Sequence, residues 1–143
     1  MIILFCLSLL SGLTNVQSGT LVLHIENVQD TKGCLQIALF KSAETFLIDE
    51  KAAYTKTIYH ETSGKIKVEL PGLPYGSYAL AIFHDEDGDG KLDKNLFGIP
   101  TESYTFSNNP KIKWRGPQYE ESKFEFNANN TSIVLQLRKW AKQ

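Results

Sequence analysis

Hydrophobic residues alternate with polar or small residues along several short stretches of the chain. In the clearest stretch, Ile66, Val68 and Leu70 alternate with charged side chains. Similar alternation occurs at residues 21–26, 35–39, 78–83, 124–126 and 133–137. A period of two places successive side chains on opposite faces of a β-strand, whereas an amphipathic helix needs a period near 3.6. The sequence therefore predicts an all-β protein.

Turn-forming residues separate these stretches. Residues 30–33, 63–64, 71–76 and 127–130 contain Gly, Asn, Asp, Ser or Pro, which suit tight turns. Short strands at this spacing predict a single antiparallel β-sandwich of about seven strands. For residues 42–53 we predict a short helical turn that Ser42 caps, with Phe46 and Leu47 facing inward. For residues 85–123 we predict one long loop.

The amino-terminal segment resembles an export signal. Residues 1–17 carry no charge, and residues 2–10 are apolar except for Ser8. This run is too short to span a bilayer, but it fits the apolar core of a signal peptide. We expect cleavage after Ser18, with residues 1–18 as the signal peptide and residues 19–143 as one domain. Because no Lys or Arg precedes the run, a first buried strand or helix is the alternative.

Composition and charge narrow the expected location and partners. Fifteen Lys and Arg residues against sixteen Asp and Glu residues give a net charge of −1, without the basic footprint of a nucleic-acid-binding protein. Leu13 stands where a lipoprotein signal would need its Cys, and no later segment is apolar enough to span a membrane. We therefore expect a secreted or periplasmic protein. Cys34 would be its only Cys, and we expect it to be a buried strand residue.

An acidic, glycine-containing run follows the predicted strand at residues 78–83. Three Asp residues at i, i+2 and i+4 allow a tight loop to turn carboxylate oxygens inward, and Gly90 permits the sharp bend of a calcium loop. The candidate calcium ligands are the carboxylates of Asp85, Asp87 and Asp89, the backbone carbonyl of Lys91, and Asp93 directly or through water. Calcium takes six to eight oxygen ligands of this kind.

This run departs from the EF-hand pattern in two ways. Leu96 occupies the twelfth position, where an EF-hand has a bidentate Glu, and a strand instead of a helix leads into the loop. Glu102 is a candidate for the missing carboxylate, supplied from outside the loop. The alternative interpretation is a solvated acidic turn that binds no cation.

Three blocks of the sequence resemble a known family. They are residues 73–93, residues 96–109 and residues 116–119, and their most specific part is the His84–Asp85 loop followed by residues 98–102. Together they resemble domain of unknown function 2141, a secreted and mostly bacterial family, over residues 19–137. The resemblance implies an exported β-sandwich, similar to transthyretin-like and immunoglobulin-like modules, with no assigned reaction. Ser103 and Thr105 stand where the family pattern has glycines.

The leading functional hypothesis is a non-enzymatic, exported binding or accessory module with a calcium-type loop. Its partner would be a protein or a carbohydrate at the cell envelope. The aromatic residues Tyr104, Phe106, Trp114 and Tyr119 are either a partner-binding surface or a lid over the sandwich edge.

The alternative hypothesis is an enzyme, hydrolase-like, that uses His84 with the carboxylates of Asp85 and Glu102. The other interpretation of His84 is a ring that anchors the loop to the backbone. A third hypothesis is purely structural, with an acidic surface turn and a partner that binds elsewhere.

Overall fold

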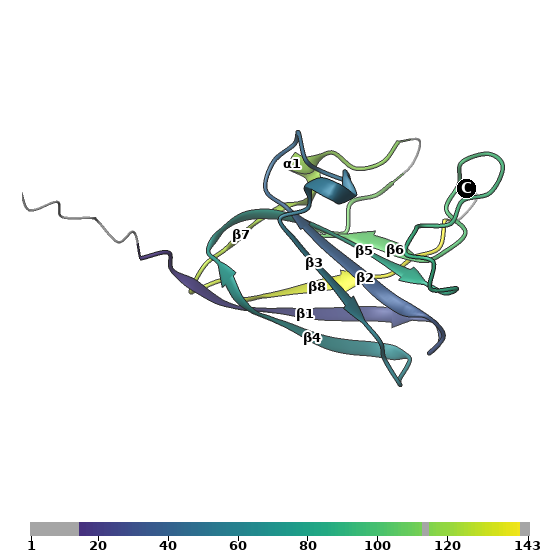
Figure 1. Cartoon of the computed structure of the whole chain (residues 1–143), viewed down its shortest axis with the longest axis horizontal. Helices are drawn as coiled ribbons and strands as arrows, with labels where there is room; N and C mark the ends of the chain where they lie inside the picture. Colours follow the sequence, from purple (N-terminus) through teal and green to yellow (C-terminus); the bar gives the residue numbers. More distant parts are fainter. Residues whose placement is uncertain (1–14, 113–114, 141–143) are drawn as a thin grey trace, which may run out of the picture.

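Two β-sheets pack face to face in this protein (Figure 1). The computed structural model describes residues 15–112 and 115–140. One sheet has the strand order β4-β1-β8, and the other has the order β3-β2-β5-β6, with β7 also paired to β5. The strands are β1 (Ser18–Val28), β2 (Cys34–Phe40), β3 (Tyr54–Ile58), β4 (Gly64–Pro74), β5 (Gly76–Asp85), β6 (Tyr104–Phe106), β7 (Lys123–Phe126) and β8 (Ser132–Gln136). The predicted all-β sandwich is confirmed.

The core lies between the sheets and is built from the alternating apolar residues of the strands. Leu21, Leu23 and Ile25 of β1 are fully buried, and Leu80 of β5 is too. Further core residues are Leu35, Ile37, Leu39, Val68, Leu70, Ile82, Phe126 and Leu135. Each fully buried Leu or Ile side chain contributes about 1.5–3 kcal/mol relative to exposure, so this shared core holds the two sheets together.

One strand pair departs from the predicted antiparallel arrangement. β8 runs parallel to β1, with Val22 opposite Ser132 and Glu26 opposite Gln136. All other pairs between these strands are antiparallel. The chain crosses from β7 in one sheet to β8 in the other. Because β8 is therefore not joined to β1 by a hairpin, it is free to run parallel to β1.

The segment predicted as a helical turn is mostly non-helical. It forms turns followed by a short 3-10 helix, η1 (Asp49–Lys51). Phe46 packs inward, with its ring 5.6 Å from that of Phe40 and 6.0 Å from that of Tyr119. The inward placement predicted for Leu47 is wrong, because Leu47 has a φ of +60° and its side chain is 42% exposed. The left-handed backbone there turns the side chain outward.

The predicted long loop contains two short elements, β6 and the helix α1 (Tyr119–Ser122). β6 pairs with the end of β5, and β7 pairs with its beginning, so both lie along the same edge of β5. β5 is thus a central strand, and it ends at Asp85, where the acidic loop (residues 85–93) begins. No helix within the two described ranges is long and apolar enough to cross a membrane.

Two sequence predictions fall wholly or largely outside the described residues. The signal-peptide segment precedes residue 15 except for its last four positions, and β1 begins at Ser18. Trp114, one of the four predicted aromatic residues, is also outside the described ranges. The single domain, the export signal and the cleavage site stay predictions.

Candidate functional site

The end of β5 sends consecutive side chains to opposite faces of the sheet. His84 continues the core-facing row of Leu80 and Ile82, while Asp85 continues the outward row of Ala81 and Phe83. Both His84 and Asp85 are fully buried. The acidic loop therefore begins with a carboxylate that is covered by the loop itself.

The carboxylate of Asp85 organises the first half of the loop. Its Oδ1 accepts a hydrogen bond from the Gly88 amide at 2.8 Å, and its Oδ2 accepts one from the Gly90 amide at 2.9 Å. Gln36 of β2 donates its side-chain Nε2 to the same Oδ2 at 3.0 Å. Burial raises the pKa of Asp85, but these hydrogen bonds outweigh it and hold the pKa below its ordinary value. Asp85 is therefore a buried, ionised anchor.

The exposed half of the loop is shaped by two short side-chain-to-backbone turns. The Asp89 amide donates to Asp87 Oδ1 at 3.1 Å, and the Lys91 amide donates to Asp89 Oδ1 at 2.7 Å. Gly88 and Gly90 have φ values of +78° and +80°, which glycine adopts without steric cost. The sharp bend predicted at Gly90 is present.

Glu102 joins the two ends of the loop. Its Oε1 accepts a hydrogen bond from the Glu86 amide at 2.8 Å, and its Oε2 accepts one from the Asp93 amide at 3.0 Å. The Thr101 amide also donates to the Asp93 carbonyl at 2.9 Å. Glu102 is 4% exposed, so this remote carboxylate lies inside the loop instead of on the surface.

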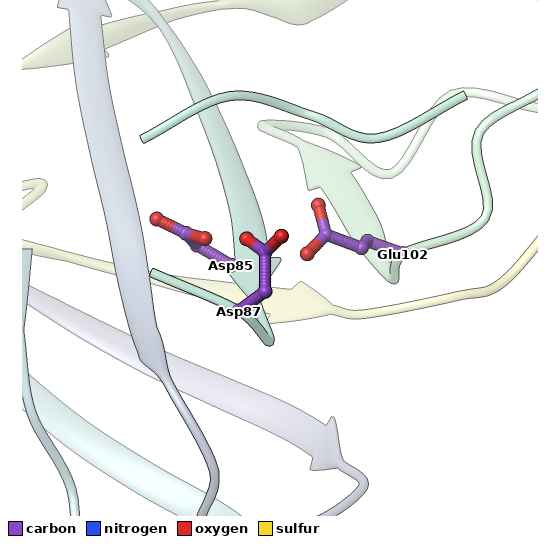
Figure 2. A group of neighbouring side chains, drawn as sticks. All are labelled: Asp85, Asp87 and Glu102. Atoms are coloured by element: carbon purple, nitrogen blue, oxygen red, sulfur yellow. The ribbon is translucent and has the colours of Figure 1, made fainter. Parts of the chain in front are cut away.

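Carboxylates of the acidic loop and the carboxylate of Glu102 meet around Asp87. Figure 2 shows Asp85, Asp87 and Glu102, each of which has one carboxylate oxygen within 4.8 Å of an oxygen of the other two. Asp87, Asp89 and Asp93 form a second group within the same distance. Burial raises the pKa of Asp93, and the charges of Asp87, Asp89 and Asp85 raise it further. Such groups of oxygen ligands are able to hold a metal ion, whose charge would offset this repulsion.

The predicted site residues differ in how far they are exposed to solvent. Asp87, Asp89, Lys91 and Asp93 are exposed, whereas Asp85 is buried. Lys91 contributes its amide to the Asp89 turn, and the role of its carbonyl as a ligand stays a prediction. Leu96, at the EF-hand position that lacks a Glu, is fully exposed.

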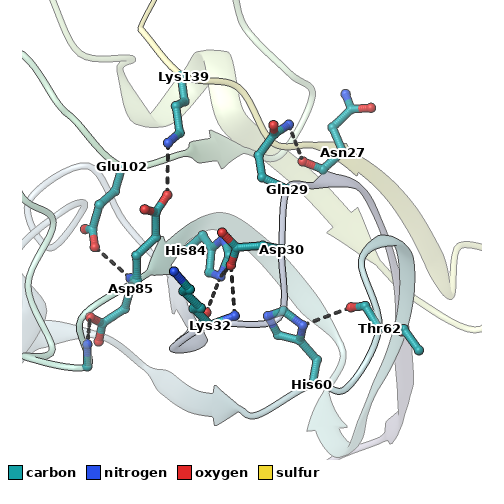
Figure 3. A network of polar contacts seen from close by, with 12 residues as sticks. Asn27, Gln29, Asp30, Lys32, His60, Thr62, His84, Asp85, Glu102 and Lys139 are labelled. Atoms are coloured by element: carbon teal, nitrogen blue, oxygen red, sulfur yellow. Dashed lines mark hydrogen bonds and ion pairs between the residues drawn. The ribbon is translucent and has the colours of Figure 1, made fainter.

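His84 is held against the backbone of the β1–β2 loop. Its Nε2 donates to the Lys32 carbonyl at 2.7 Å and lies 4.0 Å from Asp30 Oδ1 (Figure 3). The His60 ring packs beside it, with ring centroids 5.3 Å apart. A catalytic His needs access to substrate, but this ring has no exposed surface. The geometry therefore fits the backbone anchor and removes the main support for the enzyme hypothesis.

Cys34 and Gln36 of β2 complete the buried side of the site. Cys34 is 2% exposed, as predicted. Burial raises the pKa of its thiol, and the charge of Asp85 raises it further, so the thiol is protonated and unreactive. Sequence reasoning missed Gln36. The available signal was a long polar amide between the apolar Leu35 and Ile37.

Comparisons with known proteins place the chain at the level of a family. No curated protein and no solved structure matches the chain. One family of uncharacterised function matches residues 23–134, which include β2 to β7 and the whole acidic loop. The chain therefore belongs to the family DUF2141, described as an uncharacterized protein conserved in bacteria.

Proposed function

We propose that this protein is a calcium-stabilised binding or accessory module and that it acts outside the cytoplasm. The observation that carries the proposal is the position of Glu102. This buried carboxylate comes from a segment beyond the loop, yet it binds both ends of the loop and lies with Asp85 and Asp87. In an EF-hand, a Glu at the twelfth position supplies a carboxylate to the ion. In this chain Leu96 occupies that position, and Glu102 offers a carboxylate from outside the loop.

Calcium suits these residues better than other common protein-bound metals. All the gathered groups are carboxylates, and hard cations prefer oxygen ligands. Zinc sites usually include His or Cys, and the thiol of Cys34 is protonated beside Asp85. Magnesium demands a near-ideal octahedron, whereas calcium accepts six to eight oxygens in a flexible loop. Each carboxylate oxygen that accepts one amide hydrogen bond retains a further lone pair for the cation.

Bound calcium would act on the loop mainly through charge. Asp87 belongs to both carboxylate groups, so an ion beside it would tie the exposed turns to the buried Asp85 and Glu102. The ordered loop would then present its outer side to a partner at the cell envelope, either a protein or a carbohydrate. Extracellular calcium sites bind with Kd values of about 10⁻⁴ to 10⁻³ M, which is compatible with the proposed secreted or periplasmic location.

Calorimetric titration of the chelator-treated chain with calcium, and separately with magnesium, tests the proposal. We expect about one calcium per chain and a higher melting temperature at millimolar calcium. Asp87→Asn should weaken calcium binding about tenfold or more, because Asp87 belongs to both carboxylate groups. Asp49→Asn removes an exposed carboxylate on η1 and serves as the control.

The proposal fails if the folded wild-type chain shows neither heat of binding nor a thermal shift at millimolar calcium. The loop would then be an acidic turn, as the structural hypothesis holds. The proposed export is tested separately by cell fractionation and by sequencing the amino terminus of the mature chain, for which we expect Gly19. A chain found in the cytoplasm with residues 1–18 retained would contradict that part.

A further inference from the structure

The outer face of the five-stranded sheet carries a hollow of about 520 Å³, which we call the outer groove. Its floor consists of alternate side chains from three neighbouring strands, Ala38 of β2, Ala81 and Phe83 of β5, and Tyr104 and Phe106 of β6. These side chains are half-buried, so the floor remains accessible. A hollow of this volume is in the range of small-molecule sites, about 300–1,000 Å³.

The walls of the outer groove include two leucines from different loops. They are Leu47, which is 42% exposed, and Leu92 of the acidic loop. A second hollow of about 460 Å³ shares both leucines and continues to Phe97, which is 86% exposed. An exposed Phe beside such a hollow enlarges the apolar surface offered to a ligand.

The charged groups of the outer groove are mostly positive. Lys91 and Lys94 line it, and neither makes an ion pair with any residue in the described part of the chain. Asp49 is the one carboxylate among the lining residues that the structure describes. Arg115, in the second hollow, is already paired with Glu121 at 2.8 Å. Two lysines that form no ion pair among the described residues lie beside an aromatic floor, and this combination is complementary to an anion with an apolar body.

We propose that the outer groove binds a small organic anion with an aromatic body. The aromatic part would pack on Phe83, Tyr104 and Phe106, and the anionic group would lie between Lys91 and Lys94. The inference deepens the proposed function, on whose binding role it rests, by naming a class of ligand. It does not require the metal, because none of the carboxylates of the candidate calcium site lines the groove.

The groove and the acidic loop share residues, which gives the proposal a second consequence. Gly90, Lys91 and Leu92 belong to the acidic loop and line the groove. Carboxylates of that loop repel an anion, and a bound calcium would remove part of this repulsion. Calcium should therefore strengthen binding of the anion, and the anion should strengthen binding of calcium by the same factor.

Two fluorescent probes test the proposal on the full chain in chelator. They are 1-anilinonaphthalene-8-sulfonate and N-phenyl-1-naphthylamine, which has the same rings without the sulfonate. We expect saturable binding of the sulfonate, about five- to tenfold tighter than that of the neutral probe. The double variant Lys91→Gln/Lys94→Gln should remove this difference while leaving the neutral probe unchanged. Lys65→Gln/Lys67→Gln on β4, in the other sheet, is the control and should change neither probe.

A second set of variants tests the location. Ala81→Leu fills the floor and should weaken both probes about tenfold or more. If Ala81→Leu lowers the melting temperature too far for binding to be measured, Leu47→Ser at the exposed wall replaces it. Absence of saturable sulfonate binding overturns the proposal. Sulfonate binding that neither the lysine variants nor the floor and wall variants weaken would also overturn it.

Repeating the titrations with calcium separates this inference from the proposed metal site. We expect tighter sulfonate binding in calcium than in chelator. Groove binding in chelator without any calcium effect supports the groove and contradicts the predicted coupling, while the calorimetric titration decides the metal site on its own. Calcium binding without probe binding supports the metal site and overturns the groove.

Discussion

Gly33 offers the sharpest test of how the acidic loop is positioned. It lies just before β2, directly beside the residue that begins the loop, and has a φ of +68°. A Cβ at Gly33 would overlap the Asp85 carbonyl oxygen and approach Glu86 Cα to 2.8 Å. Gly33→Ala would force an alanine into a left-handed backbone conformation and would bring its Cβ into collision with the backbone of Asp85 and Glu86. The substitution should therefore destabilise the fold and displace the loop.

Gly72 provides a matched control for the loss of stability expected in Gly33→Ala. It has the same φ of +68°, but a Cβ there has no atom within 4 Å. Gly72→Ala should cost about 1–2 kcal/mol, the price of the left-handed conformation alone. Gly33→Ala should cost a further 1–3 kcal/mol or so, because the two backbones must shift apart. At about 3–4 °C per kcal/mol for a domain of this size, the two variants should differ in melting temperature by roughly 3–12 °C.

The assay is denaturant and thermal unfolding of both variants in chelator, followed by calcium titration. We expect the larger loss of stability in Gly33→Ala, and weaker calcium binding in Gly33→Ala only, since only that substitution displaces Asp85. Equal free energies of unfolding for the two variants, within about 0.5 kcal/mol, would refute the close approach of Gly33 to Asp85.

Three further predictions concern the carboxylates and the thiol. Glu102→Gln should weaken calcium binding about tenfold or more, measured by calorimetry, because it neutralises a buried candidate ligand that both loop ends contact. Hydrogen bonds lower the pKa of Asp85 in the folded state, so its stabilising effect should be present above about pH 4 and be lost as the pH falls through the lowered pKa. Unfolding measured from pH 5 to 2 should show a steeper loss for the wild type than for Asp85→Asn. Cys34 should react with a thiol reagent at pH 8 only after unfolding, because burial raises the pKa of its thiol and excludes the reagent; rapid reaction of the native chain would contradict this.

The sequence predicted the strands that bury one full face in the core. The runs in β1, β2, β4, β5, β7 and β8 all have apolar side chains at every second position. β3 was missed because its residues are half-buried at most, and β6 because three residues are too few for a periodic pattern. The parallel pairing of β8 with β1 has no signal within either strand, because direction depends on how the chain crosses between the sheets.

The sequence predicted the local bend of the acidic loop, but not the contacts that remote residues make with it. The positions of Asp87 and Asp89 and the bend at Gly90 follow from residues next to one another in sequence. The burial of Asp85 could not be predicted in this way, because it depends on Gln36 and on the register of β2 with β5. Glu102 was named from the sequence as a remote candidate, and only the folded chain shows it between the two loop ends.

The proposed function depends on whether the carboxylates around Asp87 form a calcium site. A crystal structure of the chain grown in millimolar calcium tests it most directly, with anomalous scattering used to identify the ion. We predict one calcium with a carboxylate oxygen of Asp87 at about 2.3–2.6 Å, together with oxygens of at least two of Asp85, Asp89, Asp93 and Glu102. A well-ordered loop with no ion beside Asp87 at that calcium concentration would contradict the proposed calcium site.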